Sequence, residues 1–88
     1  MYVYILKSLI TPKTYVGMTD DLMRRLAEHN SFKHFYTKRH APWQIVWREE
    51  YDTLKDARAR EKYLKSAAGR RFLKDVVFKE GNERNYGV

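Results

Sequence analysis

The sequence predicts an α+β domain with a small three-stranded sheet, mixed or antiparallel, flanked by helices in the order β-β-α-β-α-α. Short runs rich in β-branched and aromatic residues open the chain and recur near its middle, whereas later segments carry apolar residues at helical spacing. The 88 residues suffice for one domain with a modest core. We expect this domain to span residues 1–78, and we expect the polar, glycine-containing residues 79–88 to form a flexible tail.

The first two predicted strands are residues 2–6 and 14–18, which flank a polar connection and form a β-hairpin. With the turn centred on Leu9 and Ile10, Tyr4 lies directly opposite Tyr15, and both hydroxyls project from one face. Gly17 lies on the same face, where it either marks a bulge or allows another group to approach the backbone closely. Tyrosines in strands are also ordinary packing residues, so this pair alone does not establish a site.

The first predicted helix covers residues 21–29, with Asp20 as its N-cap. Four-residue spacing places Arg25 and His29 on one face of this helix. A guanidinium offers a planar fork of donors to phosphate oxygens, and an imidazole can carry a proton near neutral pH. A solvated arginine and a surface histidine are the alternative interpretation. The apolar anchors of the helix are Leu22, Met23 and Leu26.

The second predicted helix begins at Thr53, because Thr53 and Asp56 resemble a capping box. Glu61 falls within a stripe of apolar residues that we expect to face the core, namely Leu54, Ala57, Leu64 and Ala68. A carboxylate at such a position costs free energy unless a cation or a metal meets it. Glu61 is therefore either part of a structural ion pair with an arginine or a ligand of Mg²⁺, which binds through one or two carboxylates plus water and phosphate.

The remaining elements are a third strand and a third helix. Residues 43–51 alternate as a strand, with Trp43, Ile45 and Trp47 expected on one face. Gly69 is expected to end or bend the second helix, and residues 71–78 carry the apolar spacing of a short third helix.

The positive charge is concentrated late in the chain. Of the formal net charge of +7, residues 53–75 carry +5, from eight lysines and arginines and three acids. Such a surface attracts nucleic-acid phosphates, although a solvated helix face has the same composition. Residues 35–40 mix aromatics with cations and are suited to stacking on a base, or else their aromatics cap the core. The candidate nucleic-acid contacts are Gly17, Tyr36, Lys38, Arg39, Lys62, Lys65, Arg70 and Arg71.

The composition excludes several classes of protein. The chain has no cysteine, so it has neither a disulfide framework nor a thiolate zinc site. We expect no signal peptide, and the sequence has no apolar run long enough to span a membrane. We therefore expect a cytoplasmic protein with no membrane partner.

Taken together, residues 1–75 resemble the GIY-YIG nuclease family, in particular its small stand-alone members. The resemblance rests on four elements in order: Tyr2-Val3-Tyr4, Tyr15-Val16-Gly17, Arg25 followed one turn later by His29, and Arg60-Glu61-Lys62. Tyr2 replaces the glycine of the family name, which is common in the small members. The asparagine that some members place late in the domain has no clear match, since Asn82 and Asn85 do not align well.

This resemblance implies a metal-dependent endonuclease that hydrolyses phosphodiester bonds, in DNA rather than RNA, with structured or single-stranded DNA as candidate substrates. Glu61 would bind Mg²⁺ or Mn²⁺, Arg25 would stabilise developing charge, and a base acting with Tyr4 or Tyr15 would activate water. A base formed by a tyrosine needs a pKa lowered by the metal or by Arg25. His29 is assigned to proton transfer or to holding a tyrosine hydroxyl.

The alternative is a catalytically weak nucleic-acid-binding module of the same fold, acting with a partner in DNA repair or recombination. Intact Tyr4, Tyr15, Arg25 and Glu61 argue against it. The oligomeric state, the preferred substrate and any partner protein for targeting are left open by the sequence.

Overall fold

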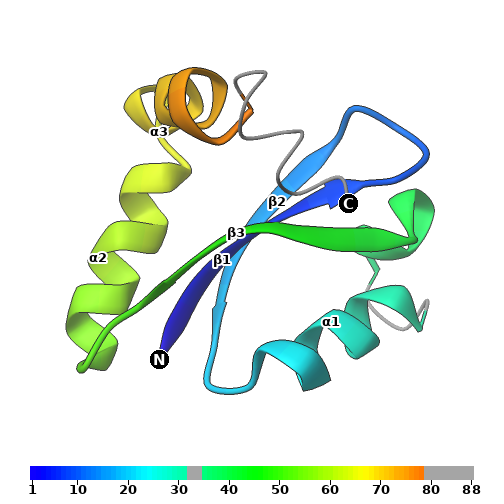
Figure 1. Cartoon of the computed structure of the whole chain (residues 1–88). Helices are drawn as coiled ribbons and strands as arrows, with labels where there is room; N and C mark the ends of the chain where they lie inside the picture. Colours follow the sequence, from blue (N-terminus) through cyan, green and yellow to red (C-terminus); the bar gives the residue numbers. More distant parts are fainter. Residues whose placement is uncertain (32–34, 79–88) are drawn as a thin grey trace.

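The computed structural model describes residues 1–31 and 35–78, and it has an antiparallel sheet in the order β2-β1-β3 (Figure 1). The strands are β1 (Tyr2–Ser8), β2 (Thr14–Thr19) and β3 (Trp43–Glu50). The predicted α+β class and order of elements are confirmed, and the sheet is antiparallel throughout. The tail expected at residues 79–88 lies outside the described residues.

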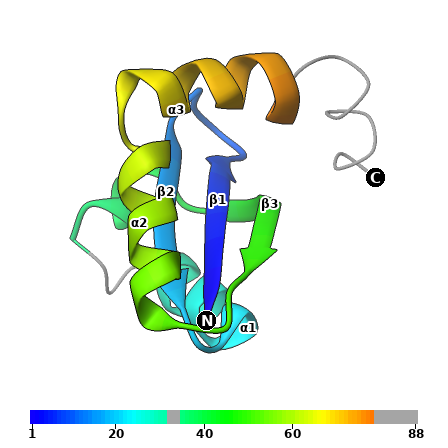
Figure 2. The same cartoon turned by 90° about the vertical axis from the view of Figure 1, so that its left-hand side faces the viewer.

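Helical elements cover both faces of the sheet (Figures 1 and 2). One face is covered by α1 (Leu22–Asn30) and the short 3₁₀ helix η1 (Thr37–His40). The other face is covered by α2 (Leu54–Leu64), by α3 (Ala67–Phe72) and by η2 (Leu73–Val77), a π-helical turn that continues from α3. The two helical layers leave β2 at one edge of the sheet and β3 at the other.

The alternation of side chains along β1 divides the core into two clusters. Val3 and Ile5 point toward α2 and pack with Val16, Ala57 and Leu64. The intervening side chains point toward α1, where the buried cluster consists of Tyr4, Leu6, Leu22, Ala41 and Trp43. Tyr4 therefore belongs to the core beneath α1.

The register of the hairpin differs from the predicted one by two residues. Tyr4 pairs with Gly17, and Leu6 pairs with Tyr15. The turn is centred one residue later than expected, on Ile10 and Thr11, and the Ser8 hydroxyl oxygen accepts the backbone N–H groups of these two residues at 3.1 Å each. A shift of two residues keeps every side chain on its face, so Tyr4, Tyr15 and Gly17 still share one surface.

A β-bulge in β3 overturns the prediction that Trp43, Ile45 and Trp47 share one face. Leu6 pairs with Ile45 whereas Ile5 pairs with Trp47, so one extra residue lies between them. Trp47 consequently lies on the side of α2 and meets the ring of Phe72 edge-on at 5.5 Å.

Side-chain oxygens cap both long helices. Asp21, not Asp20, caps α1, because its carboxylate accepts the N–H of Arg24. Asp20 instead forms an exposed ion pair with Arg24 at 2.9 Å. The predicted start of α2 is confirmed, since the Thr53 hydroxyl accepts the N–H of Asp56.

Gly69 lies inside α3 and does not end the preceding helix, contrary to the prediction. The chain turns after Leu64, and Ser66 caps the new helix by accepting the N–H of Gly69. The third helix thus begins at Ala67, earlier than the expected residue 71. A Cβ atom at Gly69 would collide with the backbone of Leu64. The glycine is required by the close approach of two consecutive helices.

We predict that Gly69→Ala destabilises the protein, although alanine ordinarily favours a helix over glycine by about 1 kcal/mol. The added methyl group must displace the Leu64 backbone, and overpacking of this kind costs about 1 to 3 kcal/mol. Urea unfolding followed by circular dichroism measures the change. Arg70→Ala on the exposed side of α3 is the control, expected within about 0.5 kcal/mol of the wild type. An equally or more stable Gly69→Ala variant would contradict the packing described.

Candidate active site

The hydroxyl of Tyr4 joins β1 to α1. Only 2% of Tyr4 is exposed. Its hydroxyl forms a hydrogen bond with His29 Nε2 at 2.9 Å and accepts a longer one from Arg25 Nε at 3.4 Å. The expected pairing of Arg25 and His29 on one face of α1 is confirmed, and the structure brings both to the same tyrosine.

Burial controls the acidity of this tyrosine. Desolvation raises the pKa of Tyr4 to about 12, while the hydrogen bond from Arg25 lowers it by a smaller amount. Arg25 alone therefore does not produce a tyrosinate near neutral pH, contrary to one of the two routes expected from the sequence. Tyr4 is a neutral phenol in this arrangement, and its proton needs an acceptor.

Arg25 connects the buried tyrosine to the surface, because 30% of its side chain is exposed. Its Nη1 donates to the Glu28 carboxylate at 2.9 Å, and the bonds to Glu28 and Tyr4 raise the pKa of the guanidinium. The same bond lowers the pKa of Glu28. Within the described residues, Nη2 has no hydrogen-bond partner, so it remains for an anion. The role of Glu28 was missed in the sequence, although its spacing of three residues from Arg25 was a signal.

His29 is fully buried and is held from two sides. Opposite its bond to Tyr4, its Nδ1 forms a hydrogen bond with the Thr37 hydroxyl at 3.0 Å. Thr37 is also fully buried, and its carbonyl accepts the indole N–H of Trp43 at 2.8 Å. Sequence reasoning missed Thr37, because no local pattern connects a threonine at the start of η1 with a histidine in α1.

Gly17 explains how the tyrosines fit beside β2. A Cβ atom at this position would lie 2.5 Å from the Tyr4 hydroxyl oxygen and 2.9 Å from Cε2 of Tyr15. Pairing between β1 and β2 is continuous through Gly17, so there is no bulge. Of the two interpretations, close approach is therefore the correct one.

Tyr15 forms the boundary between the buried cluster and the surface. Its ring lies 4.8 Å from the ring of His29 and 6.2 Å from that of Tyr36, which is exposed. Beside these tyrosines, at the β2 edge, is a hollow of about 380 Å³. It is lined by Thr14, Tyr15, Val16, Tyr36, Leu64, Lys65, Arg70 and Leu73.

The four predicted cations of the helical region are thus not equivalent. Lys65 and Arg70 line this hollow, next to Tyr15. Lys62 and Arg71 are exposed but do not line it. Of the four, only the first pair therefore lies beside the tyrosines.

The aromatic and basic segment before β3 lies on the surface. Phe35 is exposed, so it does not cap the core, and Lys38 and Arg39 lie over its ring at 5.2 and 5.8 Å. Tyr36 is the member of this segment that reaches the tyrosine cluster. The segment presents ring faces and cations together, as stacking on a base requires.

Glu61 projects from α2 on a stripe that is only partly buried. Ala57 and Leu64 are fully buried, whereas Leu54 is exposed, contrary to the prediction for that residue. The Glu61 side chain is 19% exposed and meets Lys65 Nζ at 3.4 Å. It lies close enough to Tyr4 to contribute to the raised pKa of that tyrosine, after the larger effect of burial.

The arginine next to Glu61 in the sequence does not form the ion pair considered above for that carboxylate. Arg60 binds Glu49 with two hydrogen bonds, at 2.9 and 3.1 Å. Glu61 is paired instead with Lys65, whose side chain is half exposed. Within residues 1–31 and 35–78, no three acids or histidines gather into a metal-binding group. The single carboxylate of Glu61 fits Mg²⁺, because this ion can take most of its ligands from water and substrate phosphate.

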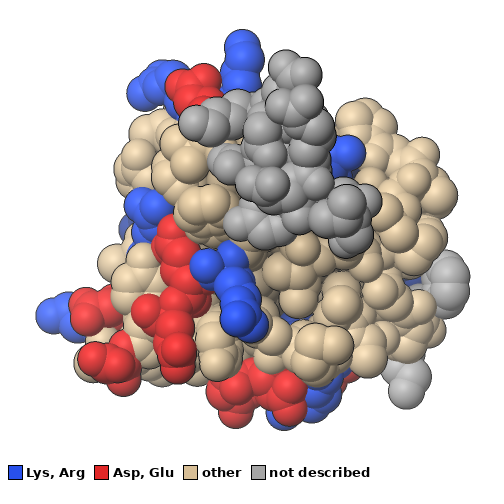
Figure 3. All heavy atoms as spheres, in the orientation of Figure 1, with Lys and Arg blue, Asp and Glu red and all other residues tan. Residues whose placement is uncertain are grey.

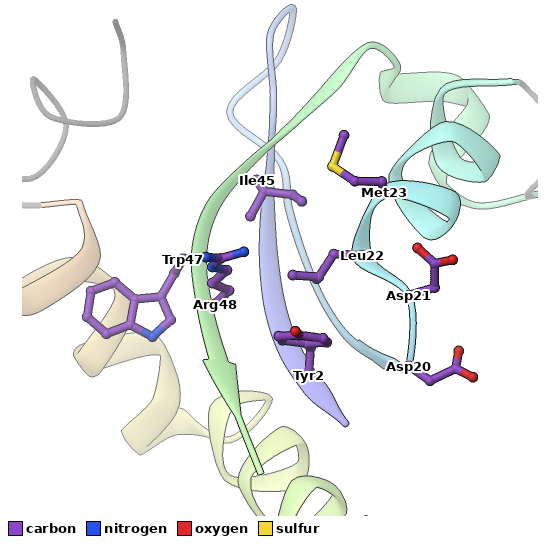
Figure 4. A pocket seen from close by; sticks show the side chains of 8 residues that line it. All are labelled: Tyr2, Asp20, Asp21, Leu22, Met23, Ile45, Trp47 and Arg48. Carbon is purple, nitrogen blue, oxygen red and sulfur yellow. The ribbon is translucent and has the colours of Figure 1, made fainter.

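A larger hollow, of about 730 Å³, lies away from this cluster at the β3 edge (Figure 4). Tyr2, Leu22 and Ile45 lie around it, with Asp20 and Asp21 at the start of α1. On this side of the molecule, acidic side chains gather over the end of β3 and the start of α2 (Figure 3). This face is less suited to a polyanion than the β2 edge.

Comparison with known proteins agrees with these features. Residues 1–74 match the model of the GIY-YIG catalytic domain. A UPF0213 protein of Clostridium perfringens is 33% identical over 97% of this chain and 91% of its own length. A UPF0213 protein of Syntrophus aciditrophicus is 38% identical over 94% of each chain, and one of Haloquadratum walsbyi is 36% identical over 96% of this chain and 92% of its own.

No solved structure matches the chain. None of the described helices is long and apolar enough to cross a membrane. The match to the family model covers both tyrosine triplets, α1 and all of α2. The chain belongs to the GIY-YIG catalytic domain family.

Proposed function

We propose that this protein is a Mg²⁺-dependent endonuclease that hydrolyses phosphodiester bonds in DNA, with Mn²⁺ as an alternative metal. The family implies a nuclease fold and a nucleic-acid substrate. The observation that carries the proposal is the convergence of Tyr4, Arg25 and His29 at one hydroxyl, beside Glu61. Neutral partners would satisfy a buried tyrosine that is purely structural, whereas both partners of this hydroxyl are ionisable side chains.

In this function, the β2 edge holds the substrate. The free Nη2 of Arg25 binds a non-bridging oxygen of the scissile phosphate, and Lys65 and Arg70 bind phosphates farther along the strand. Because Arg25 also touches the Tyr4 hydroxyl, a phosphate on the guanidinium lies beside that tyrosine. Arg25 then stabilises the charge that develops in the transition state.

Tyr4 and His29 move the proton. Tyr4 takes a proton from the attacking water while its own proton passes to His29 Nε2, 2.9 Å away. This route avoids a free tyrosinate, which the pKa of about 12 disfavours. Tyr15 packs on the imidazole and forms the wall between the relay and the hollow. Tyr36, Lys38 and Arg39 extend the binding surface with a ring face and cations.

Glu61 would hold the metal, with water and phosphate as the other ligands. When bound, the metal supplies Lewis acidity at a phosphate oxygen. Lys65 shares the Glu61 carboxylate in the present arrangement, and it can move to a substrate phosphate because its side chain is half exposed. DNA repair and recombination are the candidate processes, and a cytoplasmic location is part of the proposal.

The proposal is tested by incubating the purified protein with flapped, branched, single-stranded and duplex DNA and with RNA, with and without Mg²⁺ or Mn²⁺. We expect metal-dependent cleavage of at least one DNA substrate, and cleavage of RNA to be weaker. Binding of DNA without cleavage under every condition would favour the alternative of a binding module. Cleavage that persists in a chelator would contradict the metal dependence.

We predict that Glu61→Gln abolishes metal-dependent cleavage while changing DNA affinity by no more than a few-fold. Glutamine keeps the shape of the side chain but removes the charge that binds a divalent cation. Cleavage rates and fluorescence anisotropy of labelled DNA measure the two effects separately. Asp56→Asn at the exposed start of α2 is the control, expected to retain activity. Full activity of Glu61→Gln would remove Glu61 from the metal site.

We also predict that the four exposed cations of the helical region contribute unequally to DNA binding, according to whether they line the hollow beside Tyr15. Replacing Lys65 and Arg70 with glutamine should weaken DNA binding and flatten its salt dependence, by roughly 0.7 to 0.9 in the log–log slope per lost phosphate contact. The matched control replaces Lys62 and Arg71, which carry the same charge but lie outside the hollow, and should change the slope less. Equal slopes for the two double variants would indicate that the hollow does not bind the phosphate chain.

A further inference from the structure

The inner nitrogen of His29, Nδ1, forms a hydrogen bond with the hydroxyl of Thr37. Both residues are fully buried, and the two polar atoms lie 3.0 Å apart. A buried polar atom that loses its partner costs about 1 to 3 kcal/mol, so this bond is expected to persist. Its effect on His29 depends on which nitrogen carries the proton.

Counting donors at Tyr4 assigns that proton. A guanidinium only donates, so the Tyr4 oxygen accepts the bond from Arg25. As a neutral and buried phenol, Tyr4 must also donate its own proton, and His29 Nε2 is the acceptor within hydrogen-bond distance. Nε2 is therefore unprotonated. A neutral imidazole then carries its proton on Nδ1, which donates to the oxygen of Thr37.

We infer that Thr37 is a positioning residue that holds His29 as the Nδ1–H tautomer and thereby keeps Nε2 free to receive the proton of Tyr4. This inference deepens the proposed function and rests on it for its catalytic consequence. The assignment of the tautomer rests on the hydrogen-bond geometry and on Tyr4 being a neutral phenol, and it does not depend on the nuclease activity. Thr37 itself does not touch the substrate.

The fold fixes Thr37 relative to His29 by a second set of bonds. The Trp43 indole donates to the Thr37 carbonyl at 2.8 Å. Asn30, next to His29, binds the backbone of Trp43 in both directions, at 2.6 and 3.1 Å. The end of α1, the start of η1 and the start of β3 are therefore joined around the imidazole. Tyr36, adjacent to Thr37, packs on Tyr15, so the same turn shapes the substrate side.

The proton balance shows why the tautomer matters. The oxygen of water forms a bond to phosphorus, and the bond from phosphorus to the leaving oxygen breaks. The proton of water goes to the Tyr4 oxygen as the Tyr4 proton goes to Nε2, which leaves an imidazolium. The leaving oxygen takes a proton from solvent, and the imidazolium later returns one. Nδ1–H donates to Thr37 throughout, so only one nitrogen changes its state.

Two variants test this inference. Thr37→Val replaces the hydroxyl with a methyl group of similar size, and Thr37→Ser keeps the hydroxyl but removes the methyl group. The tautomer of His29 is measured by ¹⁵N NMR of the imidazoles in metal-free protein, with the signals of His34 and His40 assigned by His→Gln variants. Cleavage kinetics give kcat and KM, and circular dichroism confirms folding.

In the wild type, we expect Nδ1 of His29 to be protonated and Nε2 to be unprotonated. Thr37→Val should produce mixed tautomers and lower kcat by at least about tenfold with little change in KM, because only the tautomer with an unprotonated Nε2 can receive the Tyr4 proton. The magnitude is taken by analogy with metal sites, where the partner that orients an imidazole is worth about 10- to 100-fold. Thr37→Ser should retain the wild-type tautomer and most of kcat. If Thr37→Val fails to fold, the wild-type spectrum and Thr37→Ser still decide.

Protonation of Nε2 in the wild type would overturn the inference, as would unchanged kcat in Thr37→Val or a loss in Thr37→Ser as large as in Thr37→Val. The failure of the proposed function has a different signature. A wild-type protein that cleaves nothing but shows the Nδ1–H tautomer would remove the nuclease proposal and leave the hydrogen-bond assignment in place.

Discussion

The structure depends on one constraint, the burial of the Tyr4 hydroxyl beneath α1. A phenol at this depth must have its hydrogen bonds satisfied by the protein, and His29 and Arg25 supply them. The neighbouring position on β2 must then be glycine, since a Cβ atom would collide with the hydroxyl. The buried imidazole in turn requires Thr37. A chain of polar contacts thus crosses the apolar cluster and fixes α1 on the sheet.

The same burial decides what the cluster can do chemically. It raises the pKa of Tyr4, which makes a stable tyrosinate unfavourable and makes an adjacent proton acceptor important. The guanidinium of Arg25 extends from the buried tyrosine to the surface, where it pairs with Glu28. The cations that face the hollow, Lys65 and Arg70, come from the layer on the opposite face of the sheet. The β2 edge is where the two layers meet.

Much of this arrangement could be predicted from the sequence, because it depends on local patterns. The order of the elements, the cap of α2 and the shared face of Arg25 and His29 follow from propensity and spacing. The surface shared by Tyr4 and Tyr15 also follows, because the error in register was an even number of residues.

The features that were missed depend on specific side-chain and backbone contacts that no repeating sequence pattern encodes. The Ser8 hydroxyl holds the hairpin turn through two backbone N–H groups, and the bulge in β3 places Trp47 on the side of α2. The early start of α3 requires the close approach of Gly69 to Leu64. Thr37 reaches His29 across the core from another element. Neither spacing nor composition reports such a contact, so it becomes visible only when the fold is assembled.

The central claim is that the Tyr4 hydroxyl carries the proton in the reaction, and Tyr4→Phe tests it most directly because only the oxygen is lost. The measurement is the single-turnover cleavage rate of the preferred DNA substrate with Mg²⁺, alongside DNA affinity and the unfolding midpoint. Tyr2→Phe, on the same strand and face but beside the other hollow, is the control. The account predicts a rate at least about 100-fold lower for Tyr4→Phe, with affinity nearly unchanged and Tyr2→Phe unaffected. A Tyr4→Phe variant that cleaves at the wild-type rate would contradict it.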